Sequence, residues 1–277
     1  MDSIPPDDEP RERPLTFVGA ALWTLLVALL VGIVALVLEA AHPGARYDLV
    51  TTTTCKVLVY SAVFFGFLRV HAPESSIRQV LAIRRPPISV MILGILVGGG
   101  LSPLAQWASA RVAERMPPSQ EDTQAIERLF STDTSGKKIA LVVSLVFLMP
   151  IFDELFFRGA LFTLLKKGRR AEVVVVATAA YDVLALGGAP SGQLLWLLPT
   201  LLAFAWMRAV TGSVIPALLA RMTFFAVEVV PLVIRGEPKF SVYVALGGAS
   251  VAVLSLAGIA AIGRRSARVL DARLEDG

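Results

Sequence analysis

Apolar stretches of roughly 20 residues recur along the whole 277-residue chain, and they constrain its fold more than any other feature. A helix of about that length crosses the ~30 Å hydrocarbon core of a bilayer with its own backbone hydrogen bonds satisfied. Only 17 % of the residues are charged, against about 25 % in soluble domains. This composition excludes a soluble enzyme, a disordered regulator and a nucleic-acid-binding domain. We therefore predict an all-α polytopic membrane protein that has the lipid bilayer as a partner and binds no nucleic acid.

Eight stretches have the composition of membrane spans, with seven as the alternative count because the second and fifth are short. They are residues 16–38, 57–70, 88–107, 139–165, 173–186, 194–210, 213–234 and 241–262. A proline-rich, charged segment (1–14) comes before them and is typical of a disordered tail. We expect one transmembrane domain over 15–263 and a second tail over 264–277.

The distribution of Arg and Lys between the connections predicts the orientation. More of them lie on the side that carries both termini, and the run Lys166-Lys167-Gly-Arg169-Arg170 is the strongest local contributor. Cytoplasmic connections are enriched in these residues. We therefore predict a multi-pass protein of the plasma (inner) membrane of a prokaryote, with both termini in the cytoplasm.

Cysteine and histidine are scarce. The one cysteine, Cys55, excludes an intrachain disulfide and a cysteine-based zinc site. The two histidines, His42 and His71, lie at the ends of predicted spans. We expect them at the membrane edge and not in a metal site.

Three charged residues fall inside the fourth predicted span, in the sequence Pro-Ile-Phe-Asp153-Glu154-Leu-Phe-Phe-Arg158-Gly. Each costs at least about 2.5–3.5 kcal/mol at bilayer depth, so each is a candidate functional residue. Glu154 and Arg158 are four positions apart, so they share a helix face and can pair. Asp153 lies about 100° around the helix. Since one arginine does not compensate two carboxylates, the group indicates more than a structural ion pair.

This segment resembles the Glu-Glu-x-x-x-Arg motif of the CPBP family, which comprises CAAX prenyl proteases and bacteriocin-processing (ABI) intramembrane proteins. The later sequence Thr211-Gly-Ser-Val-Ile-Pro-Ala-Leu-Leu-Ala220 is similar to the entry into the family's last motif helix. The resemblance covers about 139–230. It implies an eight-span fold and the activity of an intramembrane endopeptidase that processes CAAX or membrane-bound peptides, or a role in bacteriocin immunity.

The resemblance also implies roles for the three charged residues. Glu154 corresponds to the base that activates a water molecule, Asp153 to the first glutamate of the pair, and Arg158 to the motif arginine. In the family, two histidines and an asparagine from other helices complete the site, and some descriptions add a zinc ion.

The chain departs from the family at these last positions. The family's Phe-x-x-x-His falls on Tyr181 and Ala185, and its His-x-x-x-Asn falls on Arg221 and Phe225. Alanine has no ring nitrogen, and arginine has five donors and no acceptor, so neither can bind a metal or act as a base.

Two carboxylates without the histidines fall short of the three protein ligands of a hydrolytic zinc site, so we expect no cofactor. We predict that the chain retains the fold of the family and has lost the family's hydrolytic reaction. The protein would act by binding a membrane-bound or prenylated peptide or another membrane protein.

Three alternatives remain. The first is an active intramembrane protease that uses Glu154 with partners foreign to the family. In the second, Asp182 in a Tyr-Asp pair would work with Asp153 as in aspartyl intramembrane proteases, but the Gly-x-Gly-Asp sequence of those enzymes is missing. The third is a small transporter or ion pathway through these acids and Glu228, although no inverted repeat is evident. Otherwise we expect Asp182 to pair with Arg221 or with a backbone donor.

Overall fold

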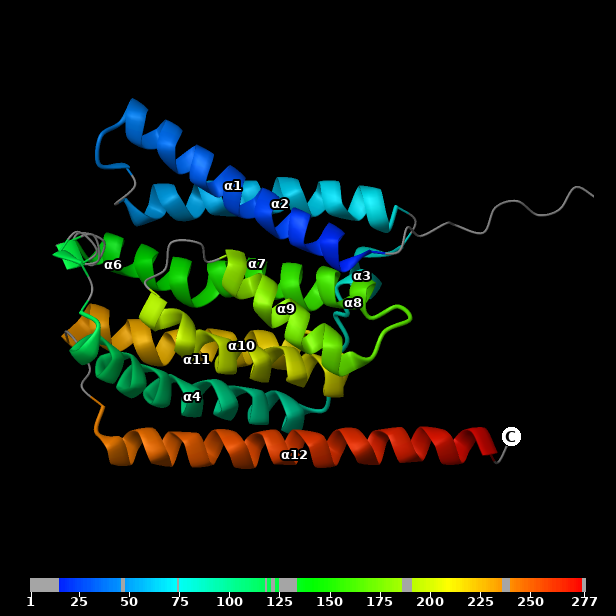
Figure 1. Ribbon diagram of the computed structural model, residues 1–277. Helices are drawn as coiled ribbons and strands as arrows, with labels where there is room; N and C mark the ends of the chain where they lie inside the picture. The colour runs from blue at the N-terminus through cyan, green and yellow to red at the C-terminus, as the bar shows by residue number, and fades with distance from the viewer. Residues whose placement is uncertain are drawn as a thin grey trace, which may run out of the picture.

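The computed structural model describes residues 15–45, 48–73, 75–117, 119–120, 123–124, 134–185, 191–235 and 240–275. Every regular element in these residues is helical, which confirms the all-α fold (Figure 1). The predicted tail 1–14 lies outside the described residues. The helices are α1 (Phe17–Ala41), α2 (Leu49–His71), α3 (Ile77–Val80), α4 (Ile88–Arg115), α6 (Ser135–Val142), α7 (Met149–Glu154), α8 (Phe162–Leu165), α9 (Ala171–Ala185), α10 (Ser191–Thr211), α11 (Ile215–Arg235) and α12 (Val242–Glu275).

Six helices of the described residues are long and apolar enough to cross a membrane, which confirms a polytopic protein. They are Phe17–Ala41, Val50–His71, Ile88–Arg115, Ser135–Leu165, Ile215–Ile234 and Val242–Gly263. The predicted fifth and sixth spans correspond to shorter apolar helices, the 15-residue α9 and Leu197–Thr211 of α10. A helix of 15 residues rises about 22 Å, less than the hydrocarbon core. Eight is therefore an approximate span count.

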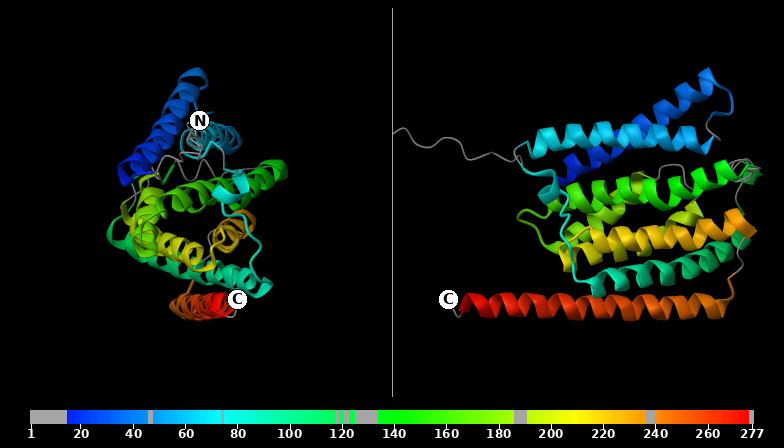
Figure 2. Two further views of the ribbon diagram at one scale, coloured as in Figure 1. Left: turned by 90° about the vertical axis from the view of Figure 1, so that its right-hand side faces the viewer. Right: turned by 180° about the vertical axis from the view of Figure 1, so that it is seen from behind.

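The helices run side by side as a bundle of nearly parallel rods (Figures 1 and 2). Helices α1 and α2 lie at one edge and α12 at the other, with α4 beside α12 and α11 beside α4. Many large apolar side chains of α1, α2, α4 and α12 are exposed. In a polytopic protein such a surface is the one that contacts lipid tails. Past Gly263, α12 continues as one helix to Glu275 and projects beyond the bundle.

Helix α4 approaches α11 and α12 through glycines. A Cβ atom on Gly98 would lie 1.9 Å from the Ala220 carbonyl oxygen of α11, and one on Gly100 would lie 2.4 Å from the Gly248 carbonyl oxygen of α12. Small residues allow such close contact between helix backbones in lipid. The glycines therefore fix how near α4 stands to the helix that carries Arg221.

The fourth span is one continuous rod in which two π-helical segments enclose α7. They are η2 (Val143–Leu148) before it and η3 (Leu155–Leu161) after it. Short π-helical insertions in α-helices occur frequently at functional sites. Asp153 and Glu154 end α7, and Arg158 lies in η3.

The turn between α10 and α11 sets the start of the helix that carries Arg221. Gly212 has a φ of 66°, a left-handed conformation that glycine adopts without strain. The Ser213 hydroxyl then accepts a hydrogen bond from Ile215 N at 3.2 Å and donates one to Arg84 O at 2.6 Å. The serine thus caps α11 and ties it to the segment before α4.

Helix α2 corrects one predicted boundary. The second span was expected over 57–70, but the helix begins at Leu49. The polar run Thr51–Thr54 and Lys56 interrupt the apolar pattern without interrupting the helix. Lys56 therefore lies inside the helix and not in the preceding connection.

Candidate functional site

Five charged side chains meet in the interior of the bundle, and we call this group the ion-pair cluster. Its members are Asp153, Glu154, Arg158, Asp182 and Arg221. They come from α7, η3, α9 and α11, and each residue is at most 7 % exposed. The structure therefore brings together the motif residues of the fourth span, the aspartate of the fifth and the arginine of the seventh.

Arg221 occupies the centre of this cluster. Its Nη1 atom donates to Asp182 Oδ2 at 2.7 Å and to Glu154 Oε1 at 3.0 Å, and its Nη2 atom donates to Asp153 Oδ2 at 2.7 Å. One guanidinium thus binds three carboxylates. Of the two partners expected for Asp182, Arg221 is the one found, and the same arginine also binds Glu154.

Arg158 provides the second positive charge. It forms an ion pair and a hydrogen bond with Asp182, and its Nη1 atom lies 3.5 Å from Glu154 Oε1. Its Nη2 atom donates to Leu201 O of α10 at 3.0 Å. The ion pair expected from the four-residue spacing therefore forms, and Asp182 joins it from another helix.

The cluster has three carboxylates and two guanidiniums, so one negative charge is in excess when all five groups are ionised. Three of its buried atoms, Glu154 Oε2, Arg158 Nε and Arg221 Nε, have no hydrogen-bond partner among the described residues. A buried polar atom without a partner costs about 1–3 kcal/mol. The arrangement is therefore sensitive to the loss of any member.

Two residues that the sequence did not single out support the cluster. Arg208, in the last turn of α10, donates from Nε to Arg158 O at 2.9 Å and from Nη2 to Thr163 Oγ1 at 3.1 Å. It thus anchors the backbone of the π-helical segment that carries Arg158. Tyr60 of α2 is buried and forms a side-chain hydrogen bond with Asp153. Arg208 could have been singled out in the sequence because it is a charged residue near the end of the sixth predicted span. Nothing comparable in the sequence marks Tyr60.

The other predicted motif positions face apolar surroundings. Tyr181 donates from its hydroxyl to Phe17 O of α1 at 2.9 Å, and Ala185 packs at the edge of an apolar core. The Phe225 ring lies 5.6 Å from that of Phe224, centroid to centroid. The residue through which α9 enters the cluster is therefore Asp182, three positions before Ala185. Glu228, two turns after Arg221 in α11, forms no ion pair with a described residue.

The cluster does not fit the zinc ion that the family resemblance raises. Each of the three carboxylates has an oxygen within 3.0 Å of the Arg221 guanidinium, so a dication among them would lie beside a fixed positive charge. The cluster also contains no imidazole. In the described part of the chain, no group of three or more His, Cys, Asp or Glu side chains is arranged to hold a metal ion.

The fold and this cluster define a polytopic helical membrane protein built around an intramembrane acid–arginine motif. Residues 135–227, roughly a third of the chain, match the family model for Rce1-like proteins, described as type II CAAX prenyl endopeptidase Rce1-like. This match confirms the resemblance to the CPBP, or CAAX-protease, family that the sequence shows over the same part of the chain. The segment contains every member of the ion-pair cluster. No curated protein and no solved structure was found to match the chain significantly.

Proposed function

We propose that this protein keeps the architecture of a CAAX-type intramembrane endopeptidase without hydrolysing peptides, and acts by binding a membrane-bound or prenylated peptide or another membrane protein. The observation that carries the proposal is the position of Arg221. Its guanidinium contacts Glu154, the residue that corresponds to the family's base, and two further carboxylates.

The contact between Arg221 and Glu154 removes the free carboxylate oxygen that a general base needs. Such a base must lie within hydrogen-bonding reach of the water from which it takes a proton. Glu154 Oε1 is occupied by Arg221, and Glu154 Oε2 is shielded from solvent. The two guanidiniums beside it have no acceptor, so they cannot relay a proton.

The orientation is part of the proposal. The turn between α8 and α9, with Lys166, Lys167, Arg169 and Arg170, lies at the same end of the bundle as the start of α1 and the end of α12 (Figure 1). The positive-inside rule assigns this end to the cytoplasm of a prokaryotic plasma membrane. A fluorescent protein fused after Gly277 should then mature and fluoresce, whereas an alkaline phosphatase fusion at the same point should be inactive.

Proteolysis of a farnesylated CAAX peptide and of a transmembrane peptide by the purified chain in detergent tests the loss of hydrolysis. Wild type and Glu154→Gln should give the same background rate, as should the control Glu114→Gln at an exposed position. The triple variant Ala185→His, Arg221→His, Phe225→Asn, which restores the family residues, should move toward activity. Cleavage by wild type that Glu154→Gln abolishes would refute the proposal.

Binding is measured separately with the same two peptides carrying a fluorophore, by anisotropy. Saturable binding of at least one peptide without cleavage is the expected result. If neither peptide binds while wild type remains inactive, the peptide-binding half of the proposal is wrong and the loss of hydrolysis still stands.

A further inference from the structure

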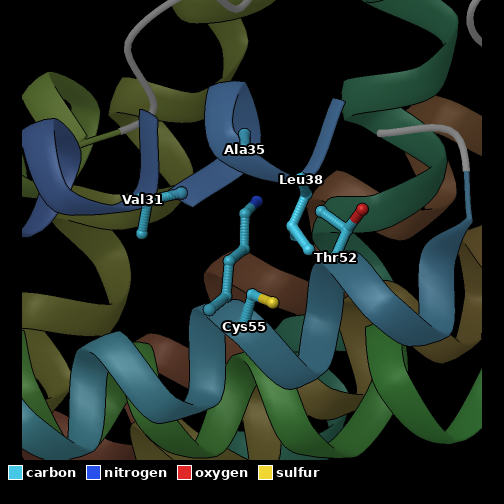
Figure 3. Close-up of a pocket in the computed structure, with 6 residues that line it drawn as sticks. Val31, Ala35, Leu38, Thr52 and Cys55 are labelled. Atoms are coloured by element: carbon cyan, nitrogen blue, oxygen red, sulfur yellow. The ribbon is translucent and has the colours of Figure 1, made fainter. Parts of the chain in front are cut away.

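A small, partly open pocket lies between α1 and α2, outside the ion-pair cluster (Figure 3). Three apolar residues of α1 face the polar half of α2 across it. The lining residues are Val31, Ala35, Leu38, Thr52, Cys55 and Lys56. Figures 1 and 2 show that α1 and α2 diverge toward their connection, and the pocket lies in the part of the two helices near that connection.

Lys56 is the cation of this otherwise mainly apolar pocket. No hydrogen bond or ion pair to Lys56 is found among the described residues. Lys56 interacts electrostatically with Asp153 of the ion-pair cluster, but the direct partners of Asp153 are Arg221 and Tyr60. An ammonium group within an apolar helix pair is costly unless an anion or water reaches it.

The acidic side chains near the α1–α2 connection are engaged locally. Glu39 Oε1 accepts a hydrogen bond from Gly44 N at 3.0 Å, and Asp48 Oδ2 accepts one from the Thr51 hydroxyl at 2.5 Å. The positive charge in the pocket is therefore available to an anion from outside the chain.

The depth of Lys56 indicates which anion can reach it. Lys56 lies seven residues after the first residue of α2, about 10 Å along the helix at 1.5 Å per residue. Its long side chain can place the ammonium nearer the membrane surface than its backbone. This is the level at which lipid headgroups meet acyl chains. The apolar residues of α1 continue the lining of the same pocket.

We propose that this pocket binds a phospholipid with an anionic headgroup. The Lys56 ammonium donates a charge-assisted hydrogen bond to the phosphate. Val31, Ala35 and Leu38 contact the first part of an acyl chain. The inference is independent of the function proposed for the ion-pair cluster.

Native mass spectrometry of the full chain tests it. Delipidated protein in mild detergent is mixed with equal amounts of phosphatidylglycerol and phosphatidylcholine of identical acyl chains. Wild type should retain phosphatidylglycerol preferentially, and Lys56→Gln should weaken this retention about tenfold, the factor expected for one charge-assisted hydrogen bond. Lys56→Arg should keep it, as should the control Lys138→Gln, which changes an exposed lysine outside the pocket.

Cys55, the single cysteine, lines the same pocket and reports occupancy without a mutation. Its alkylation by N-ethylmaleimide should be slower in nanodiscs of phosphatidylglycerol than of phosphatidylcholine, and Lys56→Gln should remove the difference. Ala35→Trp, which fills the pocket and keeps the lysine, should also reduce phosphatidylglycerol retention. This variant keeps the test decisive if Lys56→Gln does not fold.

Three results would overturn the proposal. Lys56→Gln and Lys138→Gln could retain phosphatidylglycerol equally. Wild type could bind both lipids alike. Inorganic phosphate at millimolar concentration could displace phosphatidylglycerol, which would mean that the acyl chain contributes nothing.

Discussion

Replacing Arg221 with methionine should destabilise the protein strongly. The substitution keeps much of the side-chain volume and removes the charge, which leaves three buried carboxylates facing Arg158 alone. Breaking a buried ion pair by removing one partner costs about 3–5 kcal/mol. At roughly 2–4 °C per kcal/mol for a domain of this size, the midpoint of thermal unfolding should fall by about 6–20 °C.

Thermal unfolding in a mild detergent, followed by intrinsic tryptophan fluorescence, measures the effect. Arg111→Met is the matched control, because Arg111 pairs with Glu114 at the surface, where an ion pair contributes about 1 kcal/mol or less. The double variant Arg221→Met with Asp182→Asn removes one charge of each sign. It should recover about 1–3 kcal/mol of the loss, the range of coupling energies between contacting residues.

Two outcomes would refute this reasoning. If Arg221→Met unfolds at the same temperature as wild type, the contacts of Arg221 do not stabilise the fold. If the double variant is no more stable than Arg221→Met, the cost comes from lost packing and not from uncompensated carboxylates.

Two further substitutions test the packing of the bundle. Gly98→Ala should lower the free energy of unfolding by about 1–3 kcal/mol or more, because its Cβ would lie 1.9 Å from Ala220 O, whereas Gly99→Ala, whose Cβ would make an ordinary 3.6 Å contact, should cost less than about 1 kcal/mol. Equal effects in denaturant titrations would exclude a backbone contact at Gly98. Trp23→Phe removes the 3.0 Å hydrogen bond from Trp23 Nε1 to His71 Nε2 between α1 and α2 and should cost about 1 kcal/mol, measured by the same titration. An unchanged midpoint would mean that this bond contributes nothing.

The approximate positions of the apolar helices were predictable because each apolar run must be buried in lipid as a complete helix. The ends were less predictable. The start of α2 at Leu49 was missed since threonines and Lys56 lower the hydropathy there, while nothing in that segment breaks a helix. Polar side chains can lie within a membrane helix when they face a pocket or a neighbouring helix.

The membership of the ion-pair cluster was largely predictable, because an uncompensated charge in a span requires a partner. Asp153, Glu154 and Arg158 follow from their spacing, and Asp182 and Arg221 are the remaining charges of the neighbouring motif segments.

The supports of the cluster were not predictable. The hydrogen bond from Arg208 to the Arg158 carbonyl depends on how α10 packs against η3, and that of Tyr60 depends on how α2 packs against α7. The two π-helical segments leave no pattern in the sequence. They nevertheless enclose the predicted motif, so its surroundings could be recognised only in three dimensions.

The contact of Gly98 with Ala220 has a consequence for the evolution of the site. Ala220 directly precedes Arg221, so the spacing between α4 and α11 sets the reach of the guanidinium toward the carboxylates. A displacement of α11 by one ångström would lengthen the 2.7 Å contacts to about 3.7 Å, which is beyond hydrogen-bonding distance. Selection that keeps the carboxylates bound to Arg221 would therefore also act on Gly98, a residue of another helix.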